Sequence, residues 1–139
     1  MIHEYVDEII PSIKNIRLQQ EKLDLVINQC VTTLSEGKKI LFCGNGGSAA
    51  EAQHLSAEFM GKFMIDRKPL PALALTVDTS VLTAIGNDFS FNEVFARQVS
   101  GIGRPGDILF CLTTSGKSMN LLKAIKVARS IGIFCVVLT

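Results

Sequence analysis

The chain has 139 residues, enough for one domain with its own hydrophobic core. Hydrophobic residues make up 47% of it and charged residues 19%, which excludes an intrinsically disordered protein. The formal net charge of +1 gives no electrostatic attraction to nucleic acid or to an anionic membrane, so we expect neither as a partner.

The cysteines and the first residues of the chain indicate its compartment. Cys30, Cys43, Cys111 and Cys135 include no CxxC spacing, which favours buried thiols in a reducing compartment over disulfides or a zinc knuckle. The first eight residues are acidic where a signal peptide is positively charged, and no apolar run approaches the roughly 20 residues of a membrane span. We therefore expect a cytoplasmic protein.

Residues 1–37 differ from the rest of the chain and predict a helical arm. Residues of one seam recur at spacings of three and four and are mostly apolar: Ile9, Ile13, Ile16, Gln20, Leu23, Ile27, Cys30 and Leu34. We expect this helix to be interrupted or to start near Pro11 and to end before Gly37. Two interpretations stay open, a helix that packs on the core of its own chain and one that also packs on another subunit.

Residues 38–139 alternate between short apolar runs and helical patterns. The predicted strands are 39–43, 72–76, 107–113 and 133–139, and the predicted helices are 48–63, 79–86, 91–101 and 118–130. Continuous apolar strands that alternate with helices are typical of a doubly wound parallel α/β sheet. Because the chain ends inside or just after its last strand, we expect the C-terminal elements that close such a fold to be missing from it.

Glycines and polar residues follow the first predicted strand. Asn45, Gly46, Gly47 and Ser48 stand between that strand and a helix, where free backbone N–H groups attract anions. The spacing is not GxGxxG, so the dinucleotide-binding fingerprint is excluded. A tight turn without a ligand is the alternative, and the Asn and Ser beside the glycines favour binding.

A hydroxyl-rich loop follows the third predicted strand. Thr113, Thr114, Ser115 and Ser118 stand at the start of a helix, where hydroxyls and N–H groups can surround a phosphate. The Gly-Lys-Ser triplet inside it is no Walker A motif, because Cys111 stands where that motif needs glycine. A turn capped by Ser and Thr is the alternative.

His54 and Glu58 lie one helical turn apart, on one face of the helix that follows the glycine loop. An imidazole and a carboxylate can share a metal ion or a proton transfer, although two ligands alone do not hold zinc. A solvated ion pair is the alternative. For Asn87 and Asp88, which follow Gly86, a turn at the end of a helix is favoured on the residues alone.

Polar clusters thus follow three of the predicted strands. The third cluster, Asp78–Ser80, follows the strand predicted at 72–76. The carboxyl ends of parallel strands meet at one edge of a sheet, so we expect all three clusters along that edge.

Four stretches together resemble the sugar isomerase (SIS) domain family, and within it the phosphoheptose isomerases: residues 43–48 (CGNGGS), 53–58 (QHLSAE), 81–88 (VLTAIGND) and 113–118 (TTSGKS). The resemblance covers residues 38–139, and the arm is compatible with it. It implies a flavodoxin-like SIS domain at 38–139. It also implies ketose–aldose isomerisation of D-sedoheptulose 7-phosphate to D-glycero-D-manno-heptose 7-phosphate through an enediol, for bacterial surface polysaccharide.

The resemblance also implies roles for residues. Glu58 would be the catalytic base, and His54 and Glu58 would be ligands of one zinc ion per subunit at the catalytic site. The sugar phosphate would contact Asn45, Gly46, Gly47, Ser48, Glu58, Asn87, Asp88, Thr113, Thr114, Ser115 and Ser118. A homotetramer with shared sites is implied as well. Members of the family take a Gln and a His from a C-terminal helix that residues 1–139 do not contain, and they usually have Ser at Thr113 and Asn at Lys117.

Two other functions remain in view. A non-catalytic binding protein on the same scaffold would resemble the bacterial replication-initiator-associating protein, which shares the arm and the Gln-His stretch. Glu58 and Gly47 favour the enzyme, because that protein lacks the carboxylate and reads Gly-Thr-Ser in its first loop. A sugar-phosphate-sensing regulator would need a DNA-binding module, and the sequence shows none.

Overall fold

The computed structural model describes residues 2–139. Contacts divide the chain into two compact units, one that ends at Thr32 and one that comprises Thr33–Thr139. This division falls inside a helix, and the sequence-based limits of 1–37 and 38–139 stay a prediction. The two units are described separately below.

The first unit is helical, as the apolar seam predicts. It contains α1 (Ile2–Ile16), a 3₁₀ turn (η1, Arg17–Gln19) and most of α2 (Gln20–Ser35). The expected interruption near Pro11 is wrong. Pro11 lies inside α1, where it removes one backbone donor without ending the helix, and the hydrogen-bond pattern changes only at residues 17–19.

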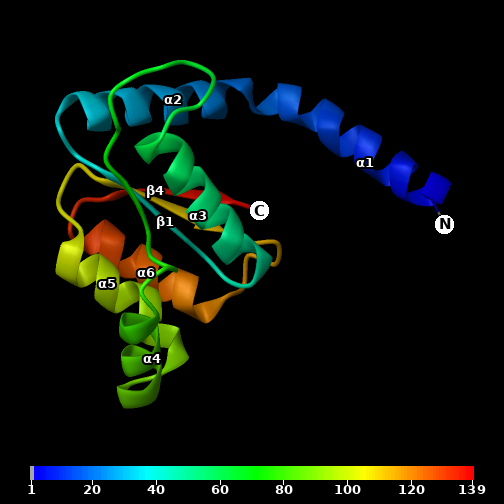
Figure 1. Ribbon diagram of the computed structural model, residues 1–139. Coiled ribbons are helices and arrows are strands. Elements are labelled where there is room, and N and C mark those ends of the chain that lie inside the picture. Colours follow the sequence, from blue (N-terminus) through cyan, green and yellow to red (C-terminus); the bar gives the residue numbers. More distant parts are fainter. Residues whose placement is uncertain (1) are drawn as a thin grey trace. The chain divides into compact units, whose positions relative to one another are not determined.

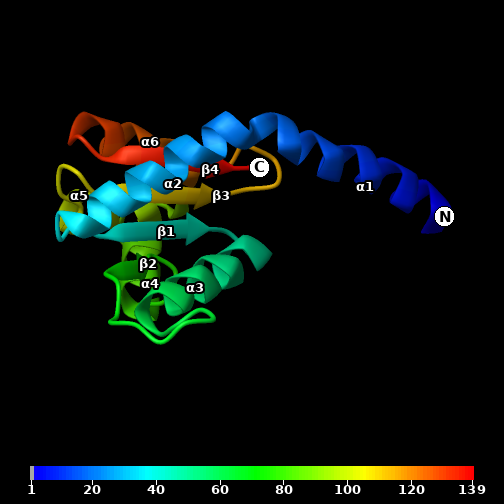
Figure 2. The ribbon, with the colours of Figure 1, turned by 90° about the horizontal axis from the view of Figure 1, so that it is seen from above.

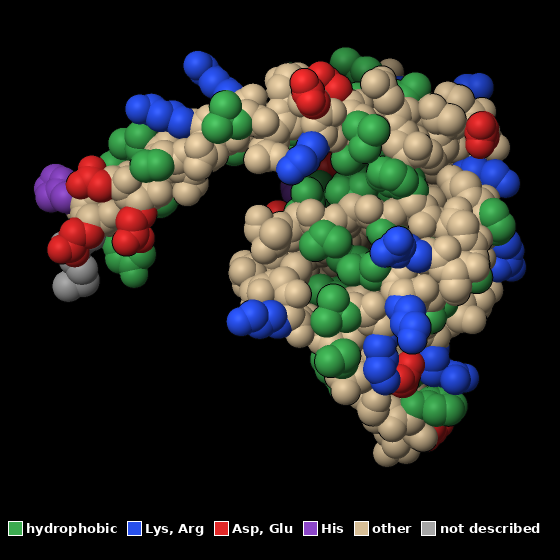
Figure 3. All heavy atoms as spheres, turned by 180° about the vertical axis from the view of Figure 1, so that it is seen from behind, with side chains coloured by type: hydrophobic (Ala, Val, Ile, Leu, Met, Phe, Trp, Pro, Cys, Tyr) green, Lys and Arg blue, Asp and Glu red, His purple; other side chains and the backbone are tan. Residues whose placement is uncertain are grey.

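Most of the seam of this arm is exposed. Of the described residues of α1 none is buried, and the side chains of Ile9, Ile13, Ile16 and Ile27 are each more than half exposed. Hydrophobic side chains are visible on the surface of the arm among charged ones (Figure 3). An apolar helix surface of this kind is suited to packing against another protein surface.

The second unit is built on a parallel sheet of four strands in the order β2-β1-β3-β4 (Figure 1). The strands are β1 (Ile40–Gly44), β2 (Ala72–Ala74), β3 (Ile108–Leu112) and β4 (Phe134–Leu138). Their carboxyl ends all lie at one edge, because every pairing is parallel. The doubly wound parallel α/β fold is thus confirmed.

Helices cover both faces of the sheet (Figures 1 and 2). The bounds are α3 (Gly47–Met60), α4 (Thr79–Asp88), η2 (Phe91–Glu93), α5 (Val94–Ile102) and α6 (Met119–Ser130). Phe42 stacks on Phe110 at 5.3 Å between ring centroids and contacts Phe59 of α3 at 5.9 Å. Successive side chains of a strand point to opposite faces, so Leu41 and Cys43 join α5 and α6 in the other half of the core.

The amino ends of β1 and β3 are closed by Asp107, whose side chain is 1% exposed. One carboxylate oxygen accepts from the backbone N–H of Lys39 at 3.0 Å. The other accepts from Lys39 Nζ at 2.6 Å and from the N–H of Arg104 at 2.8 Å. Beside it, the Thr33 hydroxyl donates to the carbonyl of Gly106 at 3.1 Å. Hydrogen bonds within the protein therefore satisfy the polar groups of Asp107 and Thr33 at this edge of the sheet.

The cysteines are free thiols, as expected from their spacing. Cys43 and Cys111 are buried on neighbouring strands, with their sulfur atoms 3.5 Å apart. The hydrogen bond with Cys111 and burial raise the pKa of Cys43 well above its usual value. Burial, and to a lesser degree Cys111, raises the pKa of Cys135 to about 11. Both thiols are therefore protonated at neutral pH and poor nucleophiles.

Across residues 2–139, no helix combines the length and the apolar character needed to cross a bilayer.

Candidate functional site

The loop after β1 turns directly into α3. A Cβ atom on Gly44 would lie 2.6 Å from the carbonyl oxygen of Ser48, so only glycine lets the helix approach the strand this closely. Gly46, in the N-cap position, has a φ of 57°, which favours glycine. The carbonyl of Asn45 accepts from the N–H of Ser48 at 3.0 Å. The first N–H groups of α3 therefore lie at the carboxyl end of β1, where they can bind an anion.

The loop after β3 is ordered by its own hydroxyl groups. Thr113 Oγ1 accepts from the N–H of Gly116 at 3.1 Å, and Ser115 Oγ accepts from the N–H of Lys117 at 3.2 Å. A hydroxyl that accepts in this way keeps its own O–H for another partner. Ser118 is the N-cap residue of α6, so this loop also ends at a helix N-terminus.

These two loops share a cavity of about 100 Å³. Its lining contains six of the predicted substrate-binding residues, together with Leu112: Asn45, Ser48, Thr113, Thr114, Ser115 and Ser118. An adjoining cavity of about 220 Å³ is lined in part by the same residues and by Glu51. The loops meet because β1 and β3 are parallel neighbours, with Gly44 opposite Leu112. Hydroxyl groups, one amide and two helix N-termini thus surround a space suited to an anion.

Asn120 joins the two loops and is a residue that the sequence reasoning missed. Its amide and that of Asn45 exchange two hydrogen bonds, of 2.8 and 3.0 Å, between positions 75 residues apart. Asn120 is 3% exposed, and its Oδ1 also accepts from the N–H of Leu121 at 3.0 Å. An asparagine in the first turn of an amphipathic helix, next to the buried Leu121, is the sequence signal that could have found it.

His54 and Glu58 lie on the later turns of α3, as their spacing predicts. His54 Nε2 is 3.6 Å from Glu58 Oε1, and the side chains are 73% and 31% exposed. Among the described residues, these two line neither of the loop cavities. Arg67 donates to the backbone carbonyls of Glu58 at 2.7 Å and Phe59 at 2.9 Å, which secures the end of α3 beside the pair.

The donor atoms of this pair fit two positions around a zinc ion. Zinc binds imidazole nitrogen and carboxylate oxygen at about 2.0–2.2 Å, which places tetrahedral ligands about 3.4 Å from each other. The observed separation of 3.6 Å is close to that spacing. Within residues 2–139, however, no three His, Cys, Asp or Glu side chains gather as a metal site. The zinc ion stays a prediction, for which His54 and Glu58 would supply two of the ligands.

The remaining predicted site residues lie apart from the loop cavity. Asn87 and Asp88 end α4, where Asn87 Nδ2 donates to Asp88 Oδ1 at 2.8 Å. Gly47 is the first residue of α3 and has open space around its Cα, and Gly46 lines a separate small cavity with Thr76. The substrate contacts implied for these four residues stay predictions.

Residues 4–139 match the family described as SIS domain. The chain belongs to the SIS domain family. It is 54% identical over 126 residues to a phosphoheptose isomerase of Nitratidesulfovibrio vulgaris and 53% identical over 117 residues to one of Akkermansia muciniphila. These alignments cover 88% and 84% of this chain but only 61% and 62% of those relatives. The chain therefore spans less than two thirds of their length.

Two solved structures resemble this SIS domain along almost its whole length. The phosphoheptose isomerase of Neisseria gonorrhoeae has 41% sequence identity and a TM-score of 0.70, with 99% of this chain and 74% of that chain covered. The one from Francisella tularensis has 34% identity and a TM-score of 0.77, with 100% and 75% covered. The fold and the family therefore agree with the resemblance drawn from the sequence motifs.

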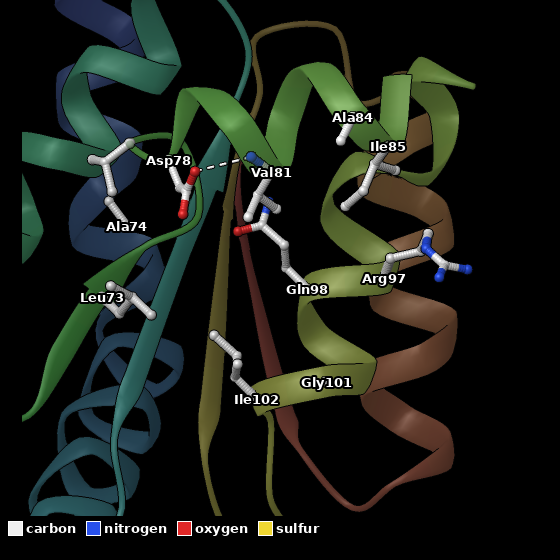
Figure 4. Close-up of a pocket in the computed structure, with 11 residues that line it drawn as sticks. Leu73, Ala74, Asp78, Val81, Ala84, Ile85, Arg97, Gln98, Gly101 and Ile102 are labelled. Carbon is white, nitrogen blue, oxygen red and sulfur yellow. Dashed lines mark hydrogen bonds between the residues drawn. The ribbon is translucent and has the colours of Figure 1, made fainter. Parts of the chain in front are cut away.

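The SIS domain also has a larger, apolar cavity of about 600 Å³ between β2, α4 and α5 (Figure 4). Two of its polar side chains hydrogen-bond to the backbone. Asp78 Oδ1 accepts from the N–H of Val81 at 2.9 Å, and Gln98 Nε2 donates to the carbonyls of Leu75 and Val94 at 3.0 and 2.9 Å. Of the third polar cluster, Asp78 lines this cavity, and none of its residues lines the loop cavity. The smaller, hydroxyl-lined cavity is the candidate site, because its groups can still donate to a ligand.

Proposed function

We propose that this SIS domain binds a phosphorylated seven-carbon sugar and takes part in its ketose–aldose isomerisation. The reaction would convert D-sedoheptulose 7-phosphate to D-glycero-D-manno-heptose 7-phosphate. The observation that carries the proposal is the cavity in which the loops after β1 and β3 meet at the N-termini of α3 and α6. The names of the relatives support this substrate class.

The phosphate would be held by local geometry, since the chain has a net charge of only +1. Thr113 and Ser115 accept hydrogen bonds from their own loop and can each donate an O–H to a phosphate oxygen. The first N–H groups of α6 and the positive end of its dipole add attraction for the same anion. The phosphate end of the substrate therefore belongs at this loop.

The isomerisation needs a base that removes a proton from C1 and returns one to C2 through an enediol. Glu58 is our candidate, because its carboxylate is about two thirds buried and lies beside the imidazole of His54. A zinc ion bound by His54 and Glu58 would supply Lewis-acid polarisation of a substrate oxygen. The residues of this chain bind the phosphate, orient the sugar and move the proton at Glu58 Oε1 or Oε2.

The assembly and location are also proposals. A cytoplasmic homotetramer would provide heptose for bacterial surface polysaccharide and would cover the exposed seam of the arm, where Ile9, Ile13 and Ile16 are each more than half exposed. Light scattering of the complete protein at working concentration tests the assembly. A monomer would contradict it.

The function is tested by incubation of the complete protein with sedoheptulose 7-phosphate, with and without a chelator. We expect heptose 7-phosphate to form without the chelator and its formation to slow with it. Glu58→Gln should abolish turnover because the amide cannot take the proton, whereas the exposed Glu36→Gln should keep the wild-type rate. Unchanged turnover in Glu58→Gln would remove Glu58 from the mechanism, and no turnover in the wild type would refute the function.

A further inference from the structure

We propose that Asn120 is a positioning residue of this site, which fixes the orientation of the Asn45 amide and joins the two ligand-binding loops. The inference deepens the proposed function and rests on it for the identity of the ligand. Asn120 itself would not touch the sugar phosphate, because it is 3% exposed and acts from behind Asn45.

The pair of Asn45 and Asn120 connects two segments that are far apart in the sequence and meet because β1 and β3 are neighbours in the sheet. Asn45 lies in the loop after β1, and Asn120 lies in the first turn of α6, directly after the hydroxyl loop. The two amides exchange two hydrogen bonds. Asn45 Nδ2 donates to Asn120 Oδ1 at 3.0 Å, and Asn120 Nδ2 donates to Asn45 Oδ1 at 2.8 Å. Two parallel hydrogen bonds fix both the separation and the relative tilt of the two amides, which a single hydrogen bond does not.

The backbone decides which way the pair is oriented. Asn120 Oδ1 also accepts from the N–H of Leu121 at 3.0 Å, so a flip of the Asn120 amide would set two donors against each other. With Asn120 fixed, Asn45 can satisfy the pair in only one orientation. The backbone of α6 therefore fixes the Asn120 amide, and Asn120 in turn fixes the amide of Asn45, which lines the loop cavity.

The pair leaves Asn45 with capacity for a ligand. Of the two Nδ2 hydrogens and two Oδ1 lone pairs of an asparagine amide, the pair uses one of each. The remaining N–H and lone pair can serve a sugar phosphate in the cavity. Truncation of Asn45 would leave the buried Asn120 Nδ2 without its acceptor, whereas Asn120 Oδ1 would keep the N–H of Leu121.

A double-mutant cycle in the complete protein tests whether Asn120 acts through Asn45. We expect Asn45→Ala and Asn120→Ala each to raise KM for sedoheptulose 7-phosphate about tenfold, the loss of one to two hydrogen bonds. The double variant should exceed the larger single effect by no more than about twofold. Multiplication of the two single effects would overturn the proposal, because it would mean that the residues act independently.

Asn120→Asp provides a variant of the same size and a readout that a purely structural role would not move. The new carboxylate lacks the donor for Asn45 Oδ1, whereas the protonated acid regains it, and burial raises the pKa of such a carboxyl. The KM ratio of variant to wild type should therefore fall towards one as the pH is lowered and the carboxyl is protonated. Taking the ratio at each pH cancels the titration of the substrate phosphate. A ratio independent of pH would contradict the proposal.

A binding experiment separates this inference from the isomerase function. Addition of inorganic phosphate to the wild type should shift the side-chain amide NMR signals of Asn45, and Asn120→Asp at neutral pH should reduce that shift. If these shifts appear but the wild type does not isomerise the sugar, the positioning role stands and the function fails. If the sugar is isomerised but the Asn45 signals respond equally in both proteins, the positioning role fails.

Discussion

At the amino ends of β1 and β3, the Asp107 carboxylate accepts three hydrogen bonds and is 1% exposed. At the carboxyl ends of the same two strands, hydroxyl groups line a cavity. Both edges are rich in polar groups. They differ in whether the protein itself saturates those groups. The amino edge stabilises the fold, whereas the carboxyl edge keeps free donors for a ligand.

The largest effect should come from Asp107→Ala at the amino edge. The variant leaves Lys39 Nζ and two backbone N–H groups without their acceptor, and we expect it to lower the free energy of unfolding by about 3 kcal/mol. Urea denaturation measures the loss, with the exposed Asp66→Ala as a control that should change stability by less than about 0.5 kcal/mol. Equal stability of both variants would show that the amino edge contributes nothing.

Gly44→Ala should destabilise the carboxyl edge of the sheet through a steric clash with α3. Its new Cβ would meet the Ser48 carbonyl oxygen at 2.6 Å, so α3 must shift, at a cost of about 2 kcal/mol. Gly47→Ala has open space at a helical position and should be neutral or stabilising by up to about 1 kcal/mol. Urea denaturation of both variants checks the pair. A loss for Gly47→Ala as large as that for Gly44→Ala would refute the steric argument.

Ser115→Ala sharpens the contrast between binding and stability. Loss of its O–H donor should weaken the affinity for inorganic phosphate about tenfold while unfolding changes by less than about 0.5 kcal/mol. Calorimetric titration and urea denaturation give the two numbers. Ser130→Ala, at the other end of α6, is the control and should leave affinity unchanged. A stability loss without a change in affinity would make the loop structural.

The last effect is absent at neutral pH and concerns the thiol of Cys135, which packs against the apolar core under α5 and α6. Burial raises the pKa of Cys135 to about 11, so the unfolded chain loses this proton before the folded protein does. Stability from this thiol is complete below about pH 8.5 and declines as the pH rises to about 11. Denaturation midpoints across this range should fall less in Cys135→Ala than in the wild type. Parallel curves would contradict the assignment.

Much of the fold could be predicted because its strands are continuous apolar runs. Residues 107–113 predicted β3, which spans Ile108–Leu112, and 133–139 predicted β4, which spans Phe134–Leu138. The second strand is shorter than expected, because only Ala72–Ala74 pair with β1, and Thr76 instead donates to the carbonyl of Ala49 in α3. Such ends depend on tertiary hydrogen bonds that local patterns do not contain.

The candidate site could be predicted only where helix periodicity or the topology of the sheet determines which residues meet. The four-residue spacing placed His54 beside Glu58, and the parallel-strand rule placed Ser48 near Ser115. The pairing with Asn120 depends on two loops 75 residues apart, which no local pattern encodes. The apolar cavity that Asp78 lines could not be predicted from the sequence either, because the packing of α4 and α5 creates it.

The first residues of α3 have a consequence for its far end. Gly46 is the N-cap of α3, so the backbone there determines in which direction each later side chain of the helix points. Each residue of an α-helix adds about 100° of rotation. An insertion of one residue between Gly44 and Ser48 would swing His54 and Glu58 by that angle and lift them about 1.5 Å along the axis. The glycine turn therefore fixes the direction in which His54 and Glu58 point, two to three turns away, and the chemistry proposed for that pair would constrain the length of the turn.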